Sequence, residues 1–201
     1  MESLAQQLTY SSEQYLFIER KAQYKSEYIN GHIFAMAGAS RQHNQITFNI
    51  AGELRLQLKG GHCVAYVNDM RVKVSQTGLY TYPDVIATCS EPQFEDVNTD
   101  TLLNPMVIIE VLSDSTEAYD RGEKFAHYRR VPSLSDYVLV AQNKVRVEHY
   151  IRQGEQWLFS ELGDLKDRIY LNSIGCELFL REIYDKVGLP DEKKPGRNEL
   201  A

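Results

Sequence analysis

The chain has 201 residues, which is long enough for one domain with a sizeable hydrophobic core. It is 43% hydrophobic and 25% charged, as is ordinary for a globular protein, and its formal net charge of -6 offers no overall basic surface to a polyanion. Its three cysteines, Cys63, Cys89 and Cys176, are widely spaced and form no CxxC pair, which argues against a disulfide framework or a zinc cluster. Buried free thiols in a reducing compartment are the expectation.

The two ends of the chain carry few signals. The N-terminus has no basic segment followed by an apolar run, and no apolar run approaches the roughly 20 residues that cross a bilayer. We therefore expect a cytoplasmic protein with no membrane partner. Residues 190–201 are charged and include two prolines, so we expect a disordered tail behind a single domain formed by residues 1–189.

Two helices and a hairpin are predicted in the first part of the chain. A capped helix is expected over residues 12–22. The dipeptide Asn30–Gly31 predicts a tight hairpin over residues 27–36, because a type I′ turn needs positive φ at both central positions. Apolar residues at every fourth position then predict an amphipathic helix over residues 40–58.

Strand patterns dominate the middle of the chain. Short strands are expected at residues 63–67, 70–74 and 82–88, followed by a polar, acidic loop over residues 90–103. The nearly continuous apolar run at residues 107–112 is typical of a central strand that is covered on both faces.

The next segments alternate between helix and strand. A helix is predicted over residues 117–130, ended by Val131–Pro132 because proline disfavours helix at the residue before it. A strand follows at residues 137–141, and then a hairpin with arms at residues 145–151 and 156–161. This order of elements predicts a mixed α/β domain.

Two acidic residues stand out against their surroundings. Glu110 lies inside the apolar central strand, and Asp84 opens the apolar segment 84–87. Burying an unpaired carboxylate costs several kcal/mol, so a cation, a basic side chain or exposure at a strand end must compensate. Carboxylates are the ligands that Mg²⁺ takes in proteins, and the pair therefore predicts a divalent-cation site. Pairing of each acid with an arginine, or capping of a helix, is the alternative.

The segments around these acids resemble a known family. Residues 82–85, 105–113 and 120–124, with the sequences YPDV, PMVIIEVLS and DRGEK, look like the Uma-type restriction endonuclease family, a branch of the PD-(D/E)xK nuclease superfamily. The resemblance extends from the hairpin at residue 27 to about residue 141. It implies an α/β fold with a restriction-endonuclease-like mixed central sheet flanked by helices.

The resemblance also implies a metal site. Asp84 and Glu110 would hold Mg²⁺ or Mn²⁺, and the backbone carbonyl of Val111 would be a further ligand. Glu27 matches an acid that in this superfamily binds metal or water; an exposed glutamate at a strand edge is the alternative for that residue.

One position departs from the superfamily pattern. A lysine normally stands two residues after the second acid, and here that position is Leu112. In the Uma-type branch the lysine comes from the next helix, where Lys124 matches it. A cationic group needs only to reach the site, so its place in the sequence is free. The alternative for Lys124 is a solvated residue on a helix.

Three further residues are candidates for substrate contacts. His43, at the start of the long helix, could touch a phosphate, although a surface histidine explains it as well. Arg121 could belong to a basic face. Tyr128 lies one helical turn beyond Lys124, so the two share a face, and core packing is its alternative.

The resemblance therefore predicts a metal-dependent endonuclease with nucleic acid, and specifically DNA, as its partner. Nothing in the residues themselves selects DNA over RNA. A homodimer would suit the cleavage of both strands. Two alternatives stay open: a catalytically impaired nuclease-fold module for nucleic-acid binding or dimerisation, and a metal-dependent hydrolase of small phosphoesters.

Overall fold

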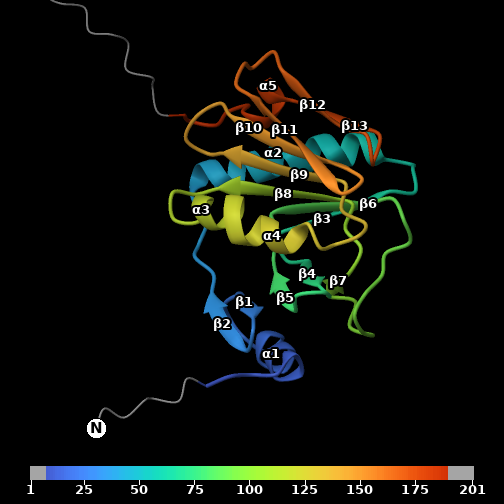
Figure 1. The fold of residues 1–201 in the computed structure, drawn as a ribbon. Coiled ribbons are helices and arrows are strands. Elements are labelled where there is room, and N and C mark those ends of the chain that lie inside the picture. Colours follow the sequence, from blue (N-terminus) through green and yellow to red (C-terminus); the bar gives the residue numbers. More distant parts are fainter. Residues whose placement is uncertain (1–7, 190–201) are drawn as a thin grey trace, which may run out of the picture.

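The computed structural model of the protein describes residues 8–189. A six-stranded mixed sheet forms its centre (Figure 1). The strands, in spatial order, are β11 (Gln156–Leu162), β10 (Val147–Gln153), β9 (Asp136–Ala141), β8 (Val107–Leu112), β6 (Val85–Thr88) and β3 (Val64–Val67). Strands β8 and β9 are parallel, whereas β8 and β6 are antiparallel.

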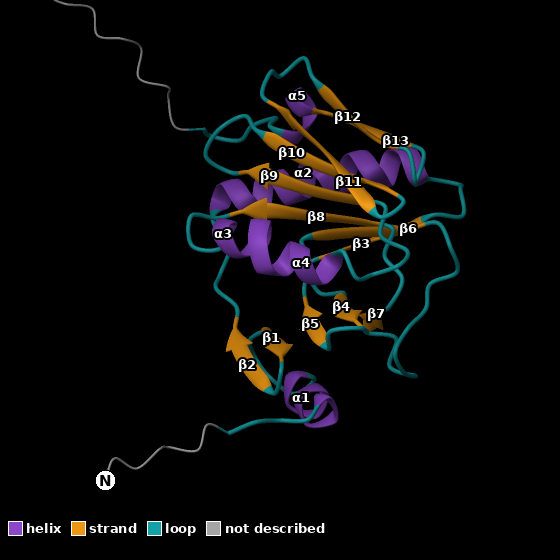
Figure 2. Cartoon of the chain, viewed as in Figure 1, coloured by secondary structure: helices purple, strands orange, loops and turns teal. Residues whose placement is uncertain are grey.

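A second sheet lies beside α1 (Ser12–Glu19), and Figure 2 shows it on the lower side of the molecule. Its five strands, in spatial order, are β2 (His32–Ala35), β1 (Ser26–Ile29), β5 (Leu79–Thr81), β4 (Arg71–Val74) and β7 (Thr101–Leu102). A separate hairpin, formed by β12 (Arg168–Leu171) and β13 (Cys176–Phe179), leads into α5 (Leu180–Ile183).

Helices cover both faces of the central sheet. The long helix α2 (Arg41–Leu58) lies on one face, and the crossover between β8 and β9 lies on the other (Figure 1). That crossover consists of α3 (Glu117–Tyr119), the π-helical turn η1 (Asp120–Lys124) and α4 (Phe125–Tyr128). A mixed α/β sheet flanked by helices is the predicted class of fold.

The buried side chains of β8 alternate between two cores because successive residues of a strand point to opposite faces. Val107, Ile109 and Val111 belong to the core that contains α2. Ile108 and Leu112 belong to the core that contains α4. Glu110, which stands between these two residues, therefore points toward the face covered by η1 and α4.

Most of the predicted elements are confirmed, with shifts at their ends. Asn30 and Gly31 have φ of 50° and 86°, as the predicted turn requires. The first helix ends at Glu19 rather than near residue 22, because the amides of Lys21 and Ala22 bond to carbonyl oxygens three residues back and close the helix in a tight turn. Its cap is Ser11, whose side chain accepts a hydrogen bond from the Gln14 amide.

Some elements were not predicted from the sequence. The segment expected as one strand from residue 82 begins as β6 only at Val85, because Pro83 has no N–H for a ladder and the chain bends at Asp84. Strand β7 lies inside the segment expected as a loop, and β5, β12, β13 and α5 were missed. The helix expected over residues 117–130 is interrupted by η1.

The cysteine prediction is wrong for one pair. Cys63 and Cys89 form a disulfide, because they face each other across the antiparallel pair of β3 and β6. The bond joins residues 26 positions apart, and spacing along the chain does not reveal which strands become neighbours. Cys176 is a buried free thiol, as expected.

Across residues 8–189, we find no helix with the length and apolar character needed to span a membrane. The tail predicted for residues 190–201 lies outside the described residues.

Candidate active site

A buried ammonium group lies at the centre of the site. Lys124 Nζ is 3.1 Å from Glu110 Oε1, 3.2 Å from Glu27 Oε1 and 3.2 Å from Asp120 Oδ1. We call these four residues the lysine cluster. The Lys124 side chain is only 7% exposed, so these contacts form with little competition from water.

The π-helical turn explains how a lysine comes to be buried here. Asp120 and Lys124 both lie in η1, four residues apart, and both are buried. A π-helical turn inserts an extra residue into the helix, and such insertions occur frequently at functional sites. The hydroxyl of Tyr137 donates a hydrogen bond to the Asp120 carbonyl oxygen at 2.9 Å and fixes the turn against β9.

Glu110 is the deepest acid of the cluster. Tyr128 donates a hydrogen bond from its hydroxyl to Glu110 Oε1 at 2.9 Å. Burial raises the pKa of Glu110 to about 8, and the carboxylates of Asp120 and Asp84 add to the rise, whereas the ammonium of Lys124 opposes it. The surroundings therefore disfavour the ionised form of Glu110 unless another cation is present.

Burial alone would lower the pKa of Lys124, but the surrounding carboxylates, Glu110 foremost, raise it well above its ordinary value. These carboxylates therefore favour the charged form of Lys124. Three acidic residues contact this single ammonium group, so the lysine cluster has more acidic groups than basic ones.

Asp84 lies next to the cluster, at the start of β6. Its Oδ2 accepts a hydrogen bond from the Val111 amide at 2.7 Å. The ladder between β6 and β8 ends at the pair of Val85 and Ile109. Beyond that pair, the Val111 amide bonds to the Asp84 carboxylate instead of to a strand carbonyl. Asp84 is thereby held beside the backbone that carries Glu110.

His43 reaches the same carboxylate from the opposite face of the sheet. Its Nε2 is 3.2 Å from Asp84 Oδ2, and its side chain is 15% exposed. The residue stands at the N-terminal end of α2, where its amide donates a hydrogen bond to Ser40 Oγ at 3.0 Å. Its Nδ1 is buried and has no hydrogen-bond partner in the part of the chain that the structure describes.

Glu27 brings the second sheet into the site. It lies on β1, and its Oε1 accepts a hydrogen bond from Thr81 on the neighbouring β5 as well as contacting Lys124. The side chain is 13% exposed. The cluster therefore draws its carboxylates from β1, β8 and η1, which belong to three separate parts of the fold.

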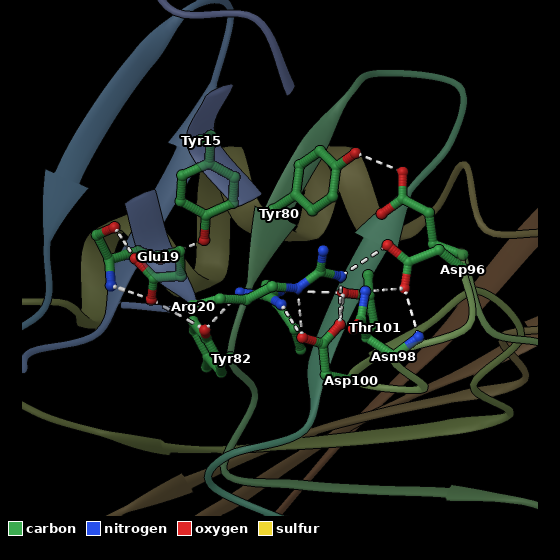
Figure 3. A network of polar contacts seen from close by, with 12 residues as sticks. Tyr15, Glu19, Arg20, Tyr80, Tyr82, Asp96, Asn98, Asp100 and Thr101 are labelled. Carbon is green, nitrogen blue, oxygen red and sulfur yellow. Dashed lines mark hydrogen bonds and ion pairs between the residues drawn. The ribbon is translucent and has the colours of Figure 1, made fainter. Parts of the chain in front are cut away.

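A buried polar network holds β1 and the bend before β6 in place (Figure 3). Glu19 of α1 accepts hydrogen bonds from the Ser26 amide at 2.9 Å and from the Tyr82 hydroxyl at 2.9 Å. Ser26 precedes Glu27, and Tyr82 lies two residues before Asp84. The carboxylate of Glu19 thus links the backbone segments that carry two acids of the site.

Arg71 extends this network toward the long loop before β7. Its guanidinium donates to the Tyr82 hydroxyl at 2.9 Å and pairs with Asp100 at 2.9 Å. Asp100 also pairs with Arg20, the C-cap residue of α1, at 2.8 Å. The C-terminal end of α1 is thereby anchored through two charged residues, Glu19 and Arg20.

The structure brings together Glu27, Glu110 and Lys124, with Asp84 and His43 beside them. Asp120 was missed as a member, although its spacing of four residues from Lys124 on a helix is a usable signal. Leu112 lies in the same core as Tyr128, and Lys124 approaches that face from η1. That Lys124 takes the place of the lysine absent at Leu112 stays a prediction.

The other predicted residues lie differently. Tyr128 is buried and faces Glu110 rather than solvent, which fits its alternative of core packing. Arg121 pairs with Glu148 at 2.9 Å and with Glu117 at 2.6 Å, so its guanidinium already has acidic partners. A substrate contact by Arg121 stays a prediction, as does a ligand role for the Val111 carbonyl.

The fold is that of a restriction-endonuclease-like α/β domain. A solved structure from Anabaena variabilis ATCC 29413, described as "a putative nuclease belonging to DUF820", superposes with a TM-score of 0.71. The match covers 86% of this chain and 96% of the other, at 17% sequence identity. At that identity the likeness establishes the architecture only.

The sequence itself places the chain in a family. Residues 12–180 match the model of the Uma2 family, described as "Putative restriction endonuclease", and the chain belongs to that family. Two proteins of Synechocystis sp. (strain ATCC 27184 / PCC 6803 / Kazusa) are similar to it over most of their length. "Uncharacterized protein sll1609" is 42% identical over 150 residues, which are 74% of this chain and 85% of that protein. "Uncharacterized protein slr1290" is 37% identical over 175 residues, which are 87% and 90% respectively.

The first prediction concerns the stability that the buried ammonium provides. Replacing Lys124 by methionine keeps the length of the side chain but leaves the carboxyl groups of Glu110, Glu27 and Asp120 without their shared cation. We expect the free energy of unfolding to fall by about 3–5 kcal/mol, the usual cost of breaking a buried ion pair from one side. Urea titration followed by the fluorescence of Trp157, which packs against Phe125 of α4, measures this loss. The exposed Lys144→Met is the matched control, and equal stability of both variants would contradict the assignment.

The second prediction concerns pH. The folded protein holds the Glu110 proton up to a pKa of about 8, whereas the unfolded chain releases it near the ordinary 4.5. Between these values the folded state binds more protons than the unfolded state, so the free energy of unfolding falls as the pH rises. Glu110→Gln should remove this contribution and flatten the decline from pH 5 to pH 8 by on the order of 2 kcal/mol. Chemical denaturation at both pH values tests it, with the exposed Glu161→Gln as control. An unchanged slope in Glu110→Gln would disprove the raised pKa.

Proposed function

We propose that the protein is a metal-dependent nuclease that hydrolyses phosphodiester bonds in DNA. One observation carries this proposal: a buried lysine is surrounded by carboxylates from both sheets, with Asp84 and His43 at its edge. Membership of the Uma2 family and the restriction-endonuclease-like fold support it.

The donor atoms suit a hard divalent cation. Asp84, Glu110 and Glu27 offer carboxylate oxygens, which Mg²⁺ and Mn²⁺ prefer over nitrogen or sulfur ligands. The excess of acids over Lys124, together with the raised pKa of Glu110, is the electrostatic condition that a cation would relieve. We assign Asp84 and Glu110 as direct ligands, and Glu27 as a ligand acting directly or through water. When bound, the ion supplies Lewis-acid activation of water and neutralises charge on the phosphate.

The other residues of the site would then have distinct tasks. Lys124, in its charged form, would stabilise the negative charge that develops on the scissile phosphate. Asp120, Glu27 and Tyr128 would hold the ammonium and the Glu110 carboxylate in a fixed arrangement. His43 would orient Asp84 and contact a substrate phosphate through the edge that remains exposed.

The substrate could be smaller than DNA. The net charge of -6 favours a small phosphoester, which does not need a basic groove. DNA remains our proposal because of the family, and a model phosphodiester separates the two. Homodimerisation, which would bring one site to each strand of a duplex, stays a prediction.

Cleavage of plasmid DNA in Mg²⁺ or Mn²⁺ is the third testable prediction. We expect the wild-type protein to nick or linearise the plasmid, and Asp84→Asn, Glu110→Gln and Lys124→Met each to lower the rate by about 100-fold or more, as loss of one charge-stabilising group does elsewhere. The exposed Glu161→Gln should cleave at the wild-type rate, and thermal melting should show which variants are folded.

Three results would contradict the proposal. Equal activity in the wild-type protein and in folded Asp84→Asn would exclude the assigned site. Retention of DNA without turnover, in either metal, would favour a binding module of the same fold. Hydrolysis of bis-p-nitrophenyl phosphate without cleavage of DNA would favour a small phosphoester as the substrate.

A further inference from the structure

A second group of metal-binding side chains lies away from the lysine cluster. His62, Cys63 and Cys89 each offer one ligand atom, and these three atoms lie within 4.8 Å of one another. We propose that, when the disulfide is reduced, these three residues form a binding site for a soft divalent cation, Zn²⁺ in particular. This proposal does not depend on the nuclease function.

The strand register places the two sulfurs together. Val64 pairs with Thr88 in the antiparallel ladder of β3 and β6, and Cys63 and Cys89 are the next residues outward, with their Cα atoms 4.0 Å apart. Facing positions on an antiparallel pair project to the same side of the sheet. Both thiolates can therefore reach one ion without any change in the pairing of the strands.

The third ligand is already at a suitable distance. His62 Nε2 lies 3.9 Å from Cys63 Sγ. Around a tetrahedral Zn²⁺, with Zn–S near 2.3 Å and Zn–N near 2.0–2.1 Å, neighbouring ligand atoms are about 3.5–3.8 Å apart. The two sulfurs must move apart to reach that spacing once the disulfide is reduced. Rotation about the cysteine side-chain bonds is sufficient for such a change.

The surroundings are fixed and accessible. The Cys89 amide donates a hydrogen bond to Met106 Sδ at 3.3 Å, which anchors the backbone where β6 ends. His62 is exposed and both cysteines are half-buried, so an ion can enter from solvent. Three protein ligands leave one position for water, as in the Cys₂His sites of zinc enzymes.

The site is separate from the proposed catalytic centre. Asp84 immediately precedes β6, and Cys89 immediately follows it. Five residues of extended chain place them about 16 Å apart. The chemistry of the two sites also differs, because oxygen ligands select hard cations and thiolates select soft ones.

The oxidised and metal-bound states exclude each other. Two equivalents of a thiol reductant transfer two electrons and two protons to the Cys63–Cys89 disulfide, giving two protein thiols and one reductant disulfide. Binding of Zn²⁺ then displaces the two thiol protons, with no change in oxidation state. In the oxidised protein neither Cys63 nor Cys89 has a thiolate to offer, so this site should not bind the ion.

Cobalt substitution tests the site, because Co²⁺ bound by thiolates gives a near-ultraviolet charge-transfer band that carboxylate-bound Co²⁺ lacks. The protein is reduced, freed of reductant under anaerobic conditions and titrated with Co²⁺. We expect the band to saturate at one equivalent and to be abolished by Zn²⁺. Cys176→Ser should retain the full band, because Cys176 is not one of the three proposed ligands.

The variants distinguish this site from others. Cys63→Ser and Cys89→Ser should each weaken or abolish the band, His62→Ala should weaken cobalt binding at least 10-fold, and Asp84→Asn should leave it unchanged. The proposal is overturned if the reduced wild-type protein gives no thiolate band. It is also overturned if the band survives in both cysteine variants, or if the oxidised protein gives the same band. An unaltered affinity in His62→Ala would remove histidine from the ligand set and contradict the three-ligand site.

Discussion

The contact of the Lys124 ammonium with three carboxylates is the constraint that organises this protein. Glu110 comes from the central strand β8, Glu27 from the second sheet and Asp120 from the π-helical turn. None of these charges could be buried alone, because each would pay the full cost of desolvation. Together they tie the two sheets and the crossover helix to one point.

The same constraint produces the functional potential of the site. One lysine neutralises only part of the negative charge of the acids around it. Burial and the remaining carboxylates therefore raise the pKa of Glu110. Strongly shifted pKa values of this kind cluster at functional sites, where a bound ligand or a transition state stabilises the charged groups. The Glu19 and Arg71 network serves the site indirectly, because it fixes the segments that carry Glu27 and Asp84.

The sequence predicted those parts of the site that local patterns determine. The apolar run around Glu110, the turn at Asn30–Gly31 and the amphipathic pattern of α2 all depend on near neighbours, and the structure confirms them. The parts that depend on tertiary register were not predictable in this way. The Cys63–Cys89 bond, the reach of His43 to Asp84 and the link from Glu19 to Tyr82 join residues from separate elements. The π-helical turn is a further case, because it has no sequence pattern of its own and its buried Asp120 was recognised only from the structure.

Crystals soaked in Mn²⁺ and measured for anomalous scattering show directly whether Asp84 and Glu110 bind a divalent cation. We expect one strong anomalous peak within coordination distance of the Asp84 and Glu110 carboxylates, with Lys124 still beside Glu110. A peak elsewhere, or none at saturating Mn²⁺ in crystals whose site is open to solvent, would contradict this expectation. In that case the lysine cluster would be a structural ion-pair network rather than a metal centre.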